Sequence, residues 1–408
     1  MTVPSSLPAR PLALVLAAAL ALGAAGCGRP QSADQGNAKG TKSSARGDAP
    51  DAAADLGFPT LATKNTTRVA GADPVADAAA VSQIVFPGTR PADRPSSVTL
   101  VDAGDWRAAL AASSLYAAPL RSPTLFTKGT SIPGATSKAL SVLSPAGSKA
   151  AGGAQVIRVG TTAKPGLLRT TDIQAKPANA FALARKIDAF VTAARGAPTS
   201  RIMLVSADDP KFAAPAAAWA AASGDTILFT HKDKAPPDTI AAIKSHRKPT
   251  IYVLGPSSVI SPKVTRQIRK LGTYHRVGGQ DPVANSIGFA VYADGDFGWG
   301  ATTPGHGMVL IPATADPATA AAAAPLSASG TYGPALLLSS SLALDGPLGG
   351  YLKDIQPGFD MNAARGFYNH AWLIGDTKAI SPQLQAAVDT QLESLPITDK
   401  SAGTEPAQ

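Results

Sequence analysis

The sequence predicts an α/β fold made of three tandem repeats, each a small parallel sheet flanked by helices. Three observations support this prediction. Apolar runs of strand length recur as SSVTLVDAGD, SRIMLVSADD and HGMVLIPATA, an alanine-rich stretch of helical length follows each run, and two longer motifs recur at fixed offsets. Strands rich in Val, Ile and Leu that alternate with helices are typical of parallel sheets covered on both faces.

Each repeat carries the same order of elements: strand, helix, strand, helix, strand. The alanine-rich stretches predict helices at 106–118, 210–222 and 315–327. The second strands are expected to begin at Thr124, Thr226 and Ala335, and the third strands at Gln155, Thr250 and Ala371. The same order of elements in three successive segments indicates a duplicated structural unit.

The end of the third strand carries the clearest repeated motif. YVLGPSSVISPKVTRQI, from Tyr252, matches WLIGDTKAISPQLQAAV, from Trp372. Ser261-Pro262 and Ser381-Pro382 fall at the same place in the two copies. A serine at the N-cap followed by proline at the first helical position is an efficient helix start, so both pairs predict one.

A second motif marks the first helix of a repeat. TRVAGADPVADAAAVSQIV, from Thr67, returns as HRVGGQDPVANSIGFAVYA, from His275. Asp73-Pro74 and Asp281-Pro282 predict helix starts with a carboxylate N-cap, and Lys176-Pro177 is the corresponding start in the second repeat. An anion on these helix N-termini is the alternative, but the two carboxylates would already occupy the positive ends.

The N-terminus predicts export. Arg10 precedes PLALVLAAALALGAAGC, whose apolar run has the length of a secretory signal and is short for a membrane span. The run ends in small residues before Cys27, the only cysteine, and this resembles a bacterial lipobox. We therefore expect a lipoprotein signal peptide over 1–26 and a lipid on Cys27; an ordinary signal with an incidental cysteine is the alternative. Residues 27–60 have the composition of a flexible tether.

Composition restricts the class of protein. Charged residues make up 16% of the chain and alanine is abundant, which excludes a long coiled coil and an acidic disordered chain. The formal net charge of +9 favours acidic partners outside the cell, such as anionic wall polymers or lipid headgroups. Nucleic acid is not expected as a partner, because the chain is exported and lacks a dense Lys/Arg stripe with interleaved aromatics.

The opening motifs resemble a known family. Arg68-Val69-Ala70-Gly71-Ala72-Asp73 and Arg276-Val277-Gly278-Gly279-Gln280-Asp281 are similar to the opening signature of the cell wall-binding repeat 2 family. This resemblance implies a noncatalytic module of exported bacterial proteins, in which three repeats pack as a pseudo-threefold group and bind an anionic wall polymer. The repeats are then expected at 61–168, 169–272 and 273–397, followed by a disordered tail at 398–408.

Candidate site residues come from the resemblance, from the basic charge of the chain and from an insertion in the third repeat. The leucine-rich second strand, associated in the family with anchoring, corresponds to Leu125, Phe126, Leu228, Phe229, Leu337 and Leu338, for which core packing is the alternative. Arg68 and Arg276 are candidate polymer-binding residues, and pairing with an acid that holds the helix start is their alternative role. Trp299, in the glycine-rich insertion ADGDFGWGATTPGHG, is the third candidate.

The sequence contains no signature of catalysis. His-Glu-x-x-His, the Walker A loop and the Gly-x-Ser-x-Gly elbow do not occur, and the five histidines have no metal-ligand spacing. Asp294-Gly295-Asp296 predicts a turn, with a calcium site as the alternative. We expect no enzyme, cofactor or metal, but an envelope lipoprotein on the outer face of the membrane that binds wall polymer and has a possible envelope protein as partner. The alternative function is a wall-active hydrolase or enzyme modifier.

Overall fold

The computed structural model describes residues 59–175, 179–329 and 333–397. The chain divides into two compact units, 1–44 and 45–408, and all the described residues belong to the second. The expected signal peptide, Cys27, nearly all of the tether and the tail at 398–408 lie outside the described residues. Within the described ranges no helix combines the length and the apolar character that a membrane crossing requires.

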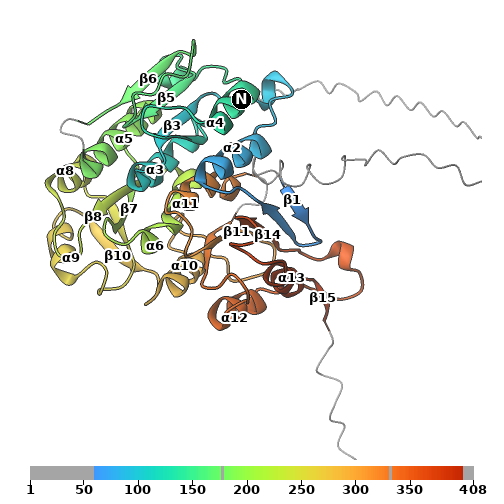
Figure 1. Ribbon diagram of the computed structural model, residues 1–408. Coiled ribbons are helices and arrows are strands. Elements are labelled where there is room, and N and C mark those ends of the chain that lie inside the picture. Colours follow the sequence, from blue (N-terminus) through green and yellow to red (C-terminus); the bar gives the residue numbers. More distant parts are fainter. Residues whose placement is uncertain (1–58, 176–178, 330–332, 398–408) are drawn as a thin grey trace, which may run out of the picture. The chain divides into compact units, whose positions relative to one another are not determined.

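The α/β prediction is confirmed, because the chain forms three small sheets with helices packed against them (Figure 1). The first sheet has the order β4-β3-β5-β6, with β3 at Val98–Asp102, β4 at Thr124–Thr127, β5 at Val156–Val159 and β6 at Thr170–Ile173. The second has the order β10-β9-β7-β8, with β7 at Arg201–Ser206, β8 at Thr226–Thr230, β9 at Thr250–Leu254 and β10 at Thr273–Val277. All pairings in these two sheets are parallel.

The third sheet has the order β1-β2-β14-β11-β12. Its strands are β1 at Pro59–Ala62, β2 at Thr66–Val69, β11 at Gly307–Pro312, β12 at Ala335–Leu338 and β14 at His370–Ile374. Only β1, at the edge, runs antiparallel to its neighbour. A separate short parallel pair joins β13 (Gly358–Phe359) to β15 (Leu395–Pro396).

The sheets are offset by one strand from the sequence repeats. β6 and β10, which open the second and third repeats, each complete the sheet of the preceding repeat. β2, which opens the first repeat, pairs with β14 of the third, with Leu373 opposite Arg68. The three repeats therefore close into a ring through a strand near the start of the folded unit.

The first helix of each repeat lies between two repeats. These helices are α2 (Pro74–Val85), α5 (Ala180–Arg195) and α10 (Pro282–Val291). The carboxylates of Asp73 and Asp281 accept from the backbone N–H three residues later, as expected of N-caps. Lys176-Pro177 falls outside the described residues, and α5 begins at Ala180 after the N-cap Asn179. The serine starts are also confirmed, for α9 (Pro262–Ile268) and α13 (Pro382–Gln391).

Three alanine-rich helices meet in the core, and their small side chains let the backbones approach closely. They are α3 (Trp106–Ala112), α7 (Pro215–Ser223) and α11 (Thr319–Ser327), and each packs against the other two. All three are shorter than predicted. α3 passes into a 3₁₀ turn at Ser113–Tyr116, α6 (Pro210–Ala213) precedes α7 because Pro215 starts a new helix, and Asp316-Pro317 forms a turn before α11. The remaining helices are α4 (Gly134–Leu143), α8 (Pro237–Ser245) and α12 (Gly346–Asp354).

Candidate functional site

Arg68, a predicted polymer-binding residue, is fully buried. Its Nε and Nη2 donate to Oε1 of Gln385 at 3.0 and 2.8 Å, and its Nη1 donates to the carbonyls of Gly375 and Asp376 at 3.1 and 2.9 Å. Desolvation by burial lowers the pKa of Arg68, against the opposing charge of Asp376. A polymer cannot reach this guanidinium, so the predicted binding role is wrong, and its partners are carbonyls and an amide rather than an acid.

Arg276 has the same structural role in the second sheet. It is partly buried, and its Nη1 and Nη2 donate to the carbonyls of Gly255 and Ile260 at 2.5 and 2.8 Å. Gly255 corresponds to Gly375 in the motif that follows the third strand. The recurring arginine therefore ties the fourth strand of a sheet to the loop after its third strand.

In the first sheet, a different arginine links the fourth strand to the loop after the third strand. Asp172 of β6 stands where the other sheets have arginine, opposite Arg158 of β5. Arg158 Nε donates to Asp172 at 2.6 Å, and Arg158 Nη1 donates to the carbonyl of Ala163 at 3.2 Å. The arginine has moved to the neighbouring strand, which explains why the opening signature is absent from the second repeat.

The second-strand residues are core residues. None of the six is more than 2% exposed: Leu125, Phe126, Leu228, Phe229, Leu337 and Leu338. They lie on β4, β8 and β12, whose burial on both faces is typical of parallel sheets. The alternative of core packing describes their place in the structure.

Trp299 also lies inside the protein, 8% exposed. Its ring is 5.2 Å from that of Trp219 at an interplanar angle of 85°, and Phe297 stacks on Tyr252 with ring centroids 3.5 Å apart. The insertion from the third repeat thus packs its aromatic residues against the second repeat. The predicted polymer-binding role of Trp299 is wrong, because its side chain is buried.

The turn at Asp294 is confirmed. Asp294 and Phe297 exchange backbone hydrogen bonds at 2.8 and 3.0 Å, and the Asp294 carboxylate accepts from the hydroxyl of Tyr252 at 3.1 Å. The part of the chain that the structure describes contains no group of three or more His, Cys, Asp or Glu side chains placed to hold a metal. The Asp294 carboxylate therefore holds the hydroxyl of Tyr252, whose ring stacks on Phe297.

The second repeat has a cationic surface that the motifs did not indicate. Between residues 239 and 280 the sequence has eight Lys and Arg residues and no Asp or Glu. Six of these cations are exposed and form no salt bridge with any described residue; we call them the basic face, and they are Lys244, Arg247, Lys248, Arg266, Arg269 and Lys270. By contrast, the nearby Lys263 pairs with Asp233 at 3.7 Å.

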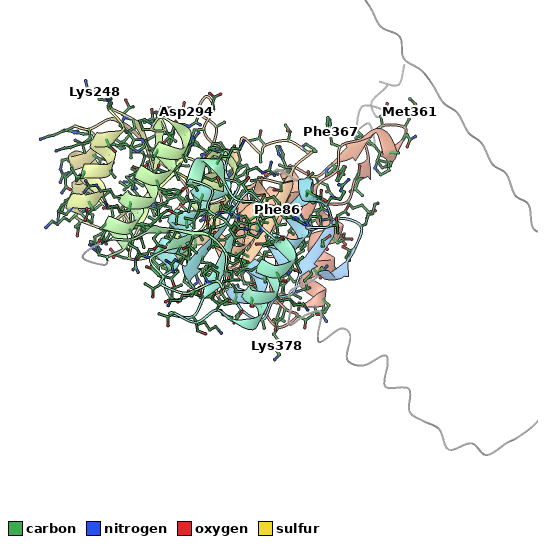
Figure 2. The ribbon with its side chains drawn as sticks, turned by 90° about the horizontal axis from the view of Figure 1, so that it is seen from above. Phe86, Lys248, Asp294, Met361, Phe367 and Lys378 are labelled. Carbon is green, nitrogen blue, oxygen red and sulfur yellow. The ribbon has the colours of Figure 1, made fainter. Side chains whose placement is uncertain are left out.

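The basic face is built from the ends of two helices. Lys244 lies in the last turn of α8, Arg266 lies in the last turn of α9, and the other four cations follow these helices. An open hollow of about 530 Å³ lies between Lys248, Arg269, Lys270 and Tyr274. Figure 2 shows Lys248 projecting from the surface, at the opposite edge from Phe367 and Met361 of the third repeat.

A buried histidine holds the loop that presents Arg247 and Lys248. His246 Nδ1 lies 2.7 Å from the carbonyl oxygen of Thr199, and its Nε2 lies 2.9 and 3.0 Å from the carboxylate oxygens of Asp188. Both nitrogens face oxygen atoms that can accept, which favours the imidazolium form with an N–H at each position. Burial works against this charge, but the hydrogen bond and charge of Asp188 outweigh it, and the pKa of His246 is raised.

The next two residues take left-handed backbone conformations. Arg247 has φ of 56° and Lys248 has φ of 67°. Side chains other than glycine, asparagine and aspartate rarely adopt this region, so the surrounding contacts must hold the turn. The anchored His246 ring precedes the turn and supplies such contacts on its N-terminal side.

The charge is unevenly distributed along the chain. Residues 169–272 contain 16 Lys and Arg against 7 Asp and Glu, whereas residues 273–397 contain 4 against 10. The overall net charge of +9 hides this contrast. A count of charge along the sequence would have found the basic face, because residues 239–280 contain eight cations and no Asp or Glu. A search for a contiguous Lys/Arg stripe misses it, because the buried strand β9 separates the cations.

Comparison with known proteins supports the fold. No family model matches the chain, and no curated protein matches it. Among solved structures, Cwp6 from Clostridium difficile superposes with a TM-score of 0.64 at 17% identity, over 81% of this chain and 48% of that one. Cwp8 from the same organism gives a TM-score of 0.59 at 16% identity, over 81% and 52%. The chain thus spans about half the length of either protein and shares its fold there.

Proposed function

We propose that this chain is a noncatalytic protein of the cell envelope that binds an anionic wall polymer through the basic face. The observation that carries the proposal is the set of six exposed cations that pair with no carboxylate in the described part of the chain. A polyanion that engages several such cations gains from multivalency, although each exposed charge pair contributes little by itself. The fold shared with Cwp6 and Cwp8, and the resemblance to cell wall-binding repeats, support the cell wall as the location.

The proposed polymer contacts are residues of the basic face, in place of Arg68 and Arg276. Lys248, Arg269 and Lys270 surround the open hollow, where phosphate or carboxylate groups of a polymer can sit between three cations. Tyr274, which is 38% exposed at the same hollow, offers a ring edge to a sugar. The hollow is open rather than enclosed. A polymer chain that extends beyond the site needs such an opening.

Binding to isolated wall tests the proposal. We expect the mature chain to bind wall that bears its anionic polymers, to bind stripped wall weakly, and to lose retention steeply as salt rises, because exposed charges are screened beyond about 8 Å at physiological ionic strength. Equal retention on stripped wall would contradict the proposal. Release of soluble wall fragments during the incubation would instead support the alternative of a wall-active hydrolase.

Attachment to the membrane through Cys27 belongs to the same proposal. It rests on the small residues before the cysteine and on the polar composition of residues 28–57. A lipid at this cysteine would place the repeats between the membrane and the wall, where the tether would give them reach. We expect Cys27→Ser to leave the protein unprocessed or to release it into the medium, and mature-sized Cys27→Ser protein in the membrane fraction would contradict lipidation.

A further inference from the structure

Two interfaces between repeats are structurally equivalent. In each interface, the carboxyl ends of two strands of one repeat face the start of a helix of the preceding repeat. Strands β7 and β8 face α3 in the first interface, and β11 and β12 face α6 in the second. Ala207, after β7, donates its N–H to the carbonyl of Thr230 at 2.8 Å, and Ala313, after β11, donates to Leu338 at 2.8 Å. These matching hydrogen bonds let us compare the two interfaces residue by residue.

Side chains of the protein itself fill the interface between the first and second repeats. Trp106, the first residue of α3, packs edge-on against Phe229 of β8, with ring centroids 5.9 Å apart. Arg107 lies over the Trp106 ring at 4.4 Å, and its Nε donates to the carbonyl of Ala207 at 2.8 Å. An aromatic ring and a guanidinium therefore complete this interface.

The interface between the second and third repeats lacks both groups. Pro210 and Lys211 begin α6 at the places of Trp106 and Arg107, and Leu337 stands at the register position of Phe229. A pocket of about 300 Å³ remains, and among its lining residues are Pro210, Lys211, Ile311, Ala313, Asp316 and Leu337. No side chain in the described ranges donates to the carbonyl of Ala313, which corresponds to the carbonyl that Arg107 caps.

We propose that this pocket binds an aromatic side chain that a partner protein presents next to an arginine. The groups that fill the equivalent interface define the chemistry that fits this one: a flat ring against the strand ends and a donor for the Ala313 carbonyl. The exposed carboxylate of Asp316 at the rim complements the arginine. The site is separate from the basic face and does not depend on the proposed function.

The dimensions fit a ring system rather than a polymer. An engineered apolar cavity of about 150 Å³ holds one benzene, so about 300 Å³ accommodates a two-ring indole. Ile311 and Leu337 are 3% and 2% exposed, so the floor of the pocket is apolar. The polar groups are restricted to the rim and to one backbone carbonyl, which is the usual composition of a specific binding pocket.

The test uses the full chain with two probes, free indole and an N-acetylated, C-amidated Trp-Arg dipeptide, and measures binding by calorimetry. We expect both to bind, with the dipeptide binding more tightly. The double variant Pro210→Trp, Lys211→Arg copies the filled interface and should weaken dipeptide binding by roughly tenfold or more. If this variant does not fold, Leu337→Phe narrows the same pocket from the strand side.

A reverse variant provides the matched control. Trp106→Ala removes the ring from the filled interface, so it should create a second indole site in a folded chain and leave the first one intact. Three results would overturn the proposal. The first is that the wild type binds neither probe, the second is that the filled variants bind the dipeptide as tightly as the wild type does, and the third is that the wild type binds the dipeptide no more tightly than free indole.

Discussion

Arg68 and Arg276 show how far a single residue can be interpreted from sequence. Their recurrence was visible, but their partners lie 307 and 21 residues away along the chain, at Gly375 and Gly255. A pattern cannot reveal such distant acceptors, so a buried structural arginine and an exposed binding arginine look alike. The cap residues Asp73, Asp281, Ser261 and Ser381 were predictable because each bonds to an N–H two or three residues later.

Arg68→Met tests the structural role of this guanidinium. The variant removes the buried guanidinium that donates to two carbonyls and to the Gln385 amide oxygen, so we expect it to lower the free energy of unfolding by roughly 3 kcal/mol. Arg276→Met, at a partly buried site, should cost less. Urea unfolding of both variants measures the difference, and an Arg68→Met protein as stable as wild type would contradict the assignment.

His246 makes stability depend on pH. Its pKa is raised in the folded state by Asp188, Thr199 and, at longer range, Asp225, so its stabilising contribution is complete below its ordinary pKa of about 6.5 and is lost as pH rises through the folded pKa. We expect the wild type to exceed His246→Gln in unfolding free energy most at about pH 6, with the gap shrinking at higher pH. Denaturation curves at several pH values measure this gap, and a gap that widens as pH rises would refute the imidazolium pair.

At the scale of elements, local signals determined most of the fold. The strands and their helices were predictable because burial on both faces leaves continuous apolar runs, and the confirmed caps mark where helices begin. The lengths of the alanine-rich helices could not be predicted, because alanine favours a helix at every position and the breaks at Ser113 and Pro215 depend on packing. The pairing of β2 with β14 was also beyond the sequence, since nothing local records a partner so distant.

The β2 strand gives a prediction about ring closure. A chain that begins at residue 71 lacks β1 and β2, leaves the edge of β14 unpaired and removes Arg68 from its buried partners. We expect such a chain to melt at a clearly lower temperature, and a peptide of residues 59–72 added in trans to restore part of the loss. Unchanged melting of the shortened chain would show that β2 does not close the ring.

At the scale of the whole molecule, the three repeats share one architecture but differ in charge. The second repeat is the most basic of the three and the third is acidic, so the surface of the third repeat is the least favourable one for a polyanion. The fold could be predicted from the repeats because all three obey the same packing rules. The family motifs did not indicate the candidate site, because it depends on a local run of cations without Asp or Glu between residues 239 and 280, and the motifs do not contain those cations.

The most direct measurement of the central claim is the affinity for polymer-bearing wall of two variants with equal charge. One neutralises four residues of the basic face by Arg247→Gln, Lys248→Gln, Arg269→Gln and Lys270→Gln. The other, a control of the same net charge, neutralises four exposed cations elsewhere: Arg94→Gln, Lys186→Gln, Lys353→Gln and Lys378→Gln. Melting curves must first show both variants folded.

We predict that the basic-face variant binds roughly 10- to 30-fold more weakly than wild type at low salt, since four exposed ion pairs contribute about 0.5 kcal/mol each. The control variant should stay within about threefold of wild type, because its cations are dispersed and the long-range effect of net charge is screened. Equal weakening of both folded variants would show that only net charge matters, and wild-type affinity in the basic-face variant would show that the polymer binds another surface.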